Sequence, residues 1–220
     1  MNIYLVRHGQ TEYNLAGRIQ GWCDSPLTET GKAGAVEMGK RLAQAKIVFD
    51  AAFCSTSPRT HHTAKLILQH TGQKDLPITP IAELREYHFG AFEGKIGNEL
   101  HDLLAKKRGF ATTEQWLHAY RNGSRNLLAE ILPQLDPNGT AESETAFLQR
   151  LQHGLHQVIG QNRPDARVLV VSHGMAIAAL VKAIAPDATR YISPPNASAT
   201  LLHFDVLRGL QLIGEIGGAI

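Results

Sequence analysis

The sequence predicts an α/β fold of three layers, in which a mostly parallel sheet lies between helices. Short apolar segments alternate along the chain with segments of helical periodicity, which is typical of this class. The segment Arg167–Ser172 contains four consecutive apolar residues. Such a run indicates a central strand of a parallel sheet, because both faces of that strand are buried.

The first 81 residues contain three expected strands and two expected helices. The strands are residues 2–6, 51–54 and 77–81. Thr28 is a suitable N-cap for the first helix, and the second helix begins near Pro58, because proline is favoured in the first turn. The apolar faces of the two helices are formed by Ala35, Met38, Leu42 and Ala45, and by Ala64, Ile67 and Leu68.

The remaining residues predict further helices and the last strands. Helical segments are expected over 98–107 and 114–132, before a stretch interrupted by Pro133, Pro137 and Gly139. A further helix carries Phe147, Leu151, Leu155 and Ile159 at four-residue intervals. After the strand at 167–172, a helix over 174–184 ends before Pro186, and strands follow at 199–204 and 210–213.

Composition restricts the class of protein. The 220 residues suffice for one domain, and 43% hydrophobic with 19% charged residues is ordinary for a globular chain. Basic residues exceed acidic ones by only 22 − 20 = 2, which gives no reason to expect a nucleic-acid or membrane partner. Cys23 and Cys54 do not form a zinc-type pair, and no signal peptide is recognised, so a reducing cytoplasm is expected.

Two strands end in a histidine motif. Arg7-His8-Gly9 follows the first strand, and His173-Gly174 follows the central one. Ligands of open α/β sheets bind beyond the carboxyl ends of the strands. If the two strands are parallel, both histidines lie at that edge.

The residues of these motifs suit the transfer of a phosphoryl group without a metal. Arg7 offers a planar fork of donors to phosphate oxygens, and His8 offers a neutral ring nitrogen that attacks phosphorus. Arg59 and His173 stand at helix starts, where backbone amides favour an anion. Glu86 is the best candidate for the proton donor, since a carboxyl group beside a bound phosphate has a raised pKa.

These motifs in this order resemble the histidine phosphatase superfamily, in its phosphoglycerate-mutase-like branch. The resemblance covers most of the first 95 residues and residues 167–175. It rests on residues 5–11 with Asn14, 18–22, 24–28 with Gly31, 57–59, 63–64, Leu84, Glu86, Gly90, 93–94 and 171–174, and more weakly on Gly139 with Glu142 and Ser143. Thr60 departs from the pattern, because alanine commonly follows the arginine of this motif.

The resemblance implies a role for each matching residue. His8 is the phosphorylated nucleophile, and Glu86 is the proton donor and later the base that activates water. The phosphoryl group is bound by Arg7, Arg59 and His173 with help from Asn14, and Gln20, Gly21 and Gly174 line the pocket. No metal or other cofactor is expected. Residues 1–220 form a single domain, in which residues 89–138 are a helical cap insertion that sets substrate preference.

The resemblance leaves two activities open. Glu93-Gly94 is typical of the phosphatase members, and the chain lacks the long arginine-bearing insertion of the mutases. The segment Gly21-Trp22-Cys23-Asp24 is more common in mutases. We therefore expect a broad-specificity phosphomonoester hydrolase acting on small phosphorylated metabolites, with a cofactor-dependent phosphoglycerate mutase as the alternative. A homodimer is included among the expected assemblies.

Two other classes compete with this interpretation. A metallohydrolase would use His61 with His62, or His153 with His156, although no zinc motif is present. A binding module with an inactive phosphatase fold would have lost a catalytic residue, and none is lost here. The basic residues 106–108 contact either a second anionic group of the substrate or only solvent.

Overall fold

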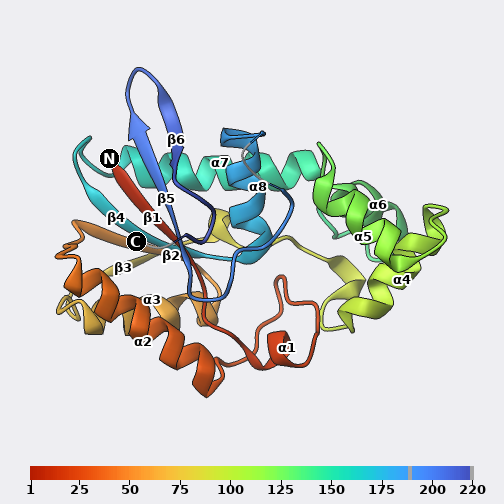
Figure 1. Cartoon of the computed structure of the whole chain (residues 1–220), viewed down its shortest axis with the longest axis horizontal. Helices are drawn as coiled ribbons and strands as arrows, with labels where there is room; N and C mark the ends of the chain where they lie inside the picture. Colours follow the sequence, from red (N-terminus) through yellow and green to blue (C-terminus); the bar gives the residue numbers. More distant parts are fainter. Residues whose placement is uncertain (188–189, 219–220) are drawn as a thin grey trace.

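The computed structural model describes residues 1–187 and 190–218, and its centre is a six-stranded sheet (Figure 1). The strands are β1 (Asn2–Arg7), β2 (Ala51–Ser55), β3 (Ile78–Ile81), β4 (Arg167–Ser172), β5 (Ala199–Asp205) and β6 (Gly209–Ile213). Their order is β3-β2-β4-β1-β5-β6. The first four are parallel, whereas β5 and β6 are antiparallel to their neighbours. The predicted mostly parallel sheet, with β4 inside it, is confirmed.

Helices cover both faces of the sheet and complete the predicted three layers (Figure 1). One face carries α2 (Glu29–Gln44) and α3 (Pro58–His70), and the other carries α7 (Glu144–Gly160) and α8 (Gly174–Ile184). Because successive strand side chains point to opposite faces, Ile3 and Leu5 pack in the layer of α7 and α8. Tyr4 and Val6 pack in the layer of α2 and α3.

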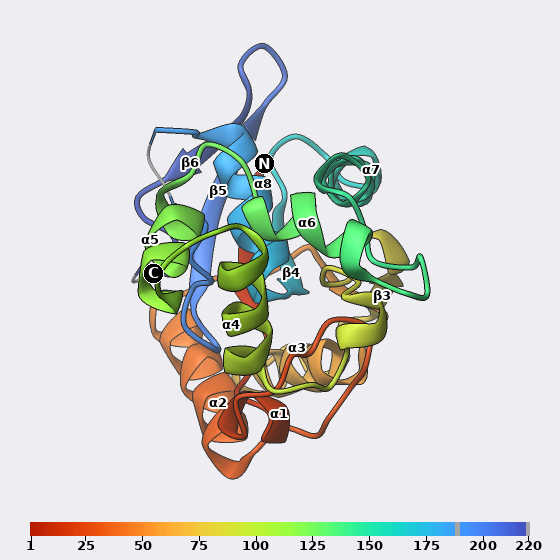
Figure 2. The same cartoon turned by 90° about the vertical axis from the view of Figure 1, so that its right-hand side faces the viewer.

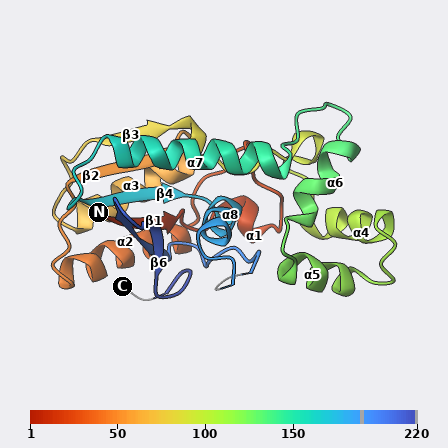
Figure 3. The ribbon, with the colours of Figure 1, turned by 90° about the horizontal axis from the view of Figure 1, so that it is seen from above.

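Three further helices lie beyond one end of the sheet and form the cap (Figures 2 and 3). They are α4 (Gly97–Lys107), α5 (Thr113–Asn122) and α6 (Leu127–Leu135). Buried cap residues such as Leu104, Trp116 and Leu132 belong to the same apolar cluster as α7 and α8. The helical cap is therefore packed against the sandwich, while the exact limits of the insertion, residues 89–138, stay a prediction.

The single helix predicted over 114–132 is wrong. The chain leaves helical geometry at Gly123, and the Asn126 side chain then accepts the backbone N–H of Ala129 at 3.2 Å as the N-cap of α6. Pro133 does not end α6, which continues to Leu135. Residues 121–126 contain no apolar side chain, so the apolar pattern is interrupted where the structure separates α5 from α6.

The remaining short elements lie in loops near the ends of the strands. They are α1 (Glu12–Leu15) and the 3₁₀ turns η1 (Ala82–Leu84) and η2 (Gly90–Phe92). No helix within residues 1–187 and 190–218 is long and apolar enough to cross a bilayer.

Candidate active site

The two histidine motifs meet at the carboxyl edge of the sheet. Arg7 of β1 pairs in register with Ser172 of β4, and the His8 N–H donates to the Ser172 carbonyl at 3.0 Å. The rings of His8 and His173 consequently lie edge to face, with centroids 5.3 Å apart. The parallel pairing of β1 and β4 therefore brings together residues that are 165 positions apart in the chain.

His8 is held as a neutral imidazole. Its ring is buried, and Nδ1 lies 2.8 Å from the carbonyl oxygen of Gly9, so Nδ1 carries the proton and Nε2 keeps its lone pair. Burial, together with the positive charges of Arg59 and Arg7, holds the pKa of His8 well below its usual range. A nucleophile that attacks phosphorus needs such an unprotonated nitrogen.

Arg59 lies almost fully buried in the first turn of α3. Its Nη1 donates to the Cys23 carbonyl at 3.0 Å and to Asp24 Oδ1 at 2.7 Å, and its Nη2 donates to the Gly21 carbonyl at 2.8 Å. Nε of Arg59 and Nε of Arg7 are buried donors without a partner among the described residues. Buried N–H groups are normally paired, so both suit the oxygens of a bound anion.

His173 connects this guanidinium to the end of β2. Its Nδ1 lies 3.0 Å from Arg59 Nη2, and its Nε2 lies 2.7 Å from the Ser55 hydroxyl. Because an arginine only donates, Nδ1 accepts and the proton resides on Nε2. Burial and the nearby Arg59 hold the pKa of His173 well below its usual range. Thr60 contacts Ser55 Oγ at 3.0 Å, so the residue that departs from the family pattern supports this contact.

The Glu86 carboxylate accepts hydrogen bonds from the N-terminus of α8. One carboxylate oxygen accepts the backbone N–H groups of Tyr87 and Ala176, and the other accepts that of Met175, all at 2.9 Å. Burial raises the pKa of Glu86, and this effect exceeds the opposing effects of the backbone donors and of Arg59 and Arg7. The direction agrees with a proton donor, and its main cause is desolvation.

The four residues predicted to line the pocket have different surroundings. Asn14 accepts from the Asn196 side chain at 3.2 Å, and Gln20 accepts from the Thr11 hydroxyl at 2.7 Å. Gly21 contributes its carbonyl oxygen to Arg59. A Cβ on Gly174 would lie 2.6 Å from Ser193 Oγ and 3.2 Å from Arg7 Nε, so this position requires glycine.

Glu93 is a positioning residue, and its contacts were not predicted from the sequence. Its carboxylate accepts the N–H groups of Gly21, Trp22, Cys23 and Phe89 at 3.0, 2.9, 3.1 and 3.0 Å. Burial alone would raise the pKa of Glu93, but these hydrogen bonds bring it below its ordinary value. Glu93 thus fixes loop 21–23, whose carbonyl groups in turn hold Arg59.

A second unpredicted pair holds the segment that carries Glu86. Arg150 of α7 binds both oxygens of Glu142 at 2.7 Å. The same guanidinium donates to the carbonyl groups of Glu83, Arg85 and Glu86 at 2.8, 3.0 and 3.0 Å. In the sequence, only the weak family match at Gly139, Glu142 and Ser143 lies in this region. That match did not predict a partner for Glu142.

The residues that the alternative interpretations would use lie outside the catalytic cluster. His61 and His62 are exposed on α3, and His153 and His156 are exposed on α7. Within residues 1–187 and 190–218, no group of three or more His, Cys, Asp or Glu side chains is arranged to hold a metal ion. The basic residues 106–108 are exposed at the end of α4.

The sequence profile of the histidine phosphatase superfamily (branch 1) matches residues 3–209. The chain belongs to this superfamily. A 2,3-bisphosphoglycerate-dependent phosphoglycerate mutase of Bradyrhizobium diazoefficiens is 32% identical over 179 residues, which cover 81% of this chain and 78% of that protein. The corresponding mutase of Hamiltonella defensa is 34% identical over 191 residues, which cover 82% and 76%.

Solved structures of the superfamily share the fold. A phosphoglycerate mutase from Bacillus anthracis superposes with a TM-score of 0.90 at 30% identity, covering 100% of this chain and 93% of that one. A mycobacterial glucosyl-3-phosphoglycerate phosphatase superposes with a TM-score of 0.74 at 24% identity, covering 99% of each chain, which shows the fold alone. The superfamily is therefore shown, while the relatives carry the names of two different activities.

Proposed function

We propose that this chain is a metal-independent phosphomonoester hydrolase that acts on small phosphorylated metabolites through a phosphohistidine. The observation that carries the proposal is the buried cluster at the sheet edge. It contains a neutral His8, the two guanidinium groups of Arg7 and Arg59, and the buried carboxyl group of Glu86. This set supplies a nucleophile, fixed positive charge and a proton donor for one tetrahedral anion.

The reaction proceeds in two balanced steps. In the first, His8 Nε2 forms a bond to phosphorus while the bond to the ester oxygen breaks, and Glu86 transfers its proton to that oxygen. Arg7 and Arg59 hold the phosphoryl oxygens, and His173 positions Arg59 by accepting from its Nη2. In the second, a water molecule attacks phosphorus, its proton passes to Glu86, and the bond to His8 breaks. Inorganic phosphate leaves, and both residues regain their initial protonation states.

Phosphoglycerate mutase is the second candidate, because the relatives from Bradyrhizobium, Hamiltonella and Bacillus anthracis carry that name. A mutase must keep a second phosphorylated sugar acid in place while the phosphoryl group returns to it. Such a molecule carries several negative charges. Among the described residues that line the cleft beside the cluster, Arg121 is the only arginine and no lysine is present. This scarcity of positive charge favours water as the acceptor.

A pair of assays on the purified chain separates these activities. Phosphate release is measured over a panel of phosphorylated metabolites in the presence of EDTA, with orthovanadate as an inhibitor that mimics pentavalent phosphorus. Isomerisation of 3-phosphoglycerate is measured with and without 2,3-bisphosphoglycerate. We expect phosphate release that vanadate blocks. Isomerisation that the bisphosphate stimulates, and that exceeds hydrolysis of every ester tried, would replace the hydrolase with the mutase.

A further inference from the structure

Trp22 lies in the loop that holds Arg59, and its indole N–H reaches the segment of the proton donor. Nε1 of Trp22 donates to the Glu86 carbonyl oxygen at 3.0 Å, across 64 positions of the chain. The carbonyl groups on either side of Trp22, those of Gly21 and Cys23, accept from Arg59 at 2.8 and 3.0 Å. One side chain therefore connects the loop that holds an anion-binding guanidinium with the residue that supplies the proton.

The indole of Trp22 is held on several sides. Its backbone N–H donates to Glu93 at 2.9 Å. The Arg85 guanidinium lies over the ring, 4.4 Å from its centroid, and the His88 ring meets it edge to face at 4.7 Å. The Arg150 guanidinium lies 5.9 Å from the same centroid. These contacts fix the direction of the indole N–H, although 37% of the residue is exposed.

The hydrogen bond from Trp22 acts on the peptide group between Glu86 and Tyr87. The carbonyl oxygen of this group accepts Trp22 Nε1 and Arg150 Nη2, both at 3.0 Å, and the two donors come from loop 21–23 and from α7. The N–H of the same group donates to Glu86 Oε1 at 2.9 Å. Because a peptide group is planar, donors that fix the direction of its oxygen also fix the direction of its N–H. The orientation of the Glu86 carboxyl group therefore depends in part on the donors at its own carbonyl oxygen.

We propose that Trp22 is a positioning residue for the proton donor, because its indole N–H orients the peptide group that directs the Glu86 carboxyl group toward the leaving oxygen. This inference rests on the proposed hydrolase function, in which Glu86 protonates that oxygen. Trp22 exchanges no proton itself and acts only through Glu86. A carboxyl group that is turned away from the ester oxygen loses rate, since proton transfer requires hydrogen-bond contact.

Trp22→Phe removes the N–H donor and keeps an aromatic ring facing Arg85. The partial exposure of Trp22 makes the replacement compatible with folding, which the melting temperature checks. We expect kcat for alkyl phosphates to fall about tenfold, while kcat for nitrophenyl phosphate, whose leaving group needs no proton, falls by less than about twofold. KM should change little for either ester, because the anion-binding arginines are retained. Equal slowing of the two esters would overturn the proposal.

A double variant tests whether Trp22 acts through Glu86. Glu86→Gln removes the transferable proton and keeps the backbone carbonyl that Trp22 binds. The effects of two residues that serve the same step do not add, so Trp22→Phe should slow alkyl phosphates by less than about twofold in the Glu86→Gln background. The full effect of Trp22→Phe in both backgrounds would give Trp22 a role independent of Glu86 and would refute the inference.

The alkaline limb of the pH profile gives a second readout. Burial raises the pKa of Glu86, and the N–H groups of Tyr87 and Met175 and the two anion-binding arginines oppose this effect. A weaker bond from Tyr87 raises the pKa further, so the alkaline limb should move to higher pH in Trp22→Phe. A general loosening that admitted water would reduce the effect of burial and move the limb to lower pH. A limb that stays in place or moves to lower pH would contradict the proposal.

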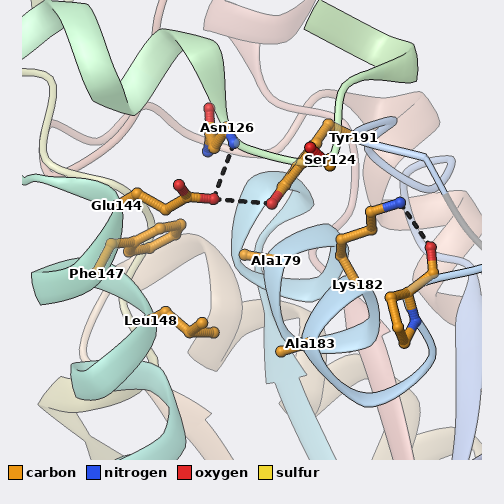
Figure 4. A pocket seen from close by; sticks show the side chains of 10 residues that line it. Ser124, Asn126, Glu144, Phe147, Leu148, Ala179, Lys182, Ala183 and Tyr191 are labelled. Carbon is orange, nitrogen blue, oxygen red and sulfur yellow. Dashed lines mark hydrogen bonds between the residues drawn. The ribbon is translucent and has the colours of Figure 1, made fainter.

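Tyr191→Phe is the matched control. It also removes one hydrogen bond made by an aromatic side chain, because the Tyr191 hydroxyl donates to Glu144 at 2.9 Å beside a separate cavity of about 200 Å³ (Figure 4). That bond does not involve the peptide group of Glu86. The ratio of alkyl to nitrophenyl rates and the alkaline limb should therefore keep their parent values. The same changes as in Trp22→Phe would show that the effect is not specific to Trp22.

The outcomes separate this inference from the hydrolase proposal. Hydrolysis that persists in His8→Ala, or equal slowing of both esters in Glu86→Gln, contradicts the hydrolase mechanism. When those two variants behave as expected, parent-like turnover of alkyl phosphates by Trp22→Phe contradicts only the role of Trp22.

Discussion

Arg59 Nη2 lies 3.0 Å from His173 Nδ1, and both side chains are almost fully buried. The contact joins the first turn of α3 to the end of β4, and the Ser55 hydroxyl fixes the opposite ring nitrogen at 2.7 Å. The imidazole is thus oriented by a cation on one side and a hydroxyl on the other. The neutral histidine accepts from Arg59 and so fixes the guanidinium, whose unpartnered Nε remains available to an anion.

Arg59→Lys should disable this site. Lysine cannot reproduce the contacts that the guanidinium makes with three carbonyl or carboxylate oxygens and with His173. We expect kcat/KM to fall by about 10²–10³, as when one preorganised donor is lost, and vanadate to bind correspondingly more weakly. Arg163→Lys, at an exposed residue paired with Asp50, is the control. Activity of Arg59→Lys within threefold of the parent would remove Arg59 from the mechanism.

Glu86→Gln should reveal the proton donor. The amide cannot protonate the leaving oxygen, so turnover of alkyl phosphates should slow by about 10²–10⁴. Nitrophenyl phosphate should be affected much less, since its leaving group departs without a proton. Glu37→Gln, at an exposed position of α2, is the matched control and should leave both substrates unaffected. Equal slowing of both substrates in Glu86→Gln would show that the acid is another group.

The pH profile follows from the directions of two pKa shifts. The pKa of His8 is lowered, so its lone pair survives as the pH falls past 6.5, and the acid limb of kcat/KM lies below that value. The pKa of Glu86 is raised, so the protonated acid persists above its ordinary 4.5 and is lost as the pH rises further. Rate profiles of the parent and Glu86→Gln test both points. An acid limb centred at or above 6.5, or an unaltered alkaline limb in Glu86→Gln, would contradict this assignment.

Glu93→Gln tests whether Glu93 positions Arg59 by fixing loop 21–23. A glutamine amide has one acceptor oxygen where the carboxylate has two, and its NH₂ group would face backbone donors. Leaving a buried donor unpaired costs about 1–3 kcal/mol, so we expect a lower melting temperature and about a tenfold to hundredfold lower kcat/KM. Weaker vanadate binding distinguishes this positioning role from a general loss of stability. Glu93→Asp should recover part of the vanadate affinity, and Glu12→Gln, at an exposed residue, is the control.

Much of the fold and the central site could be predicted because the signals are local. The apolar run of β4 and the helical pattern of α8 reflect burial, which sequence periodicity reports directly. The alternating pattern predicted a mostly parallel sheet, and the parallel pairing of β1 with β4 in the structure meets the condition under which His8 and His173 share one edge.

The residues that position the catalytic side chains could not be predicted in the same way. Glu93 binds backbone N–H groups about 70 residues away, and such groups look identical in every sequence. Arg150 likewise binds carbonyl groups more than 60 positions distant. The division between α5 and α6 differs from these supports, because it had local signals: residues 121–126 lack apolar side chains, and Asn126 is a suitable N-cap for α6.

Rapid-quench trapping of the phosphoenzyme tests the central claim most directly. The parent chain is mixed with ³²P-labelled substrate, quenched in alkali, digested and mapped by mass spectrometry. We predict an acid-labile, alkali-stable phosphoryl group on the imidazole of His8, absent from His8→Ala and chased away as phosphate is released. A label on His173, or an unlabelled protein throughout active turnover, would contradict it.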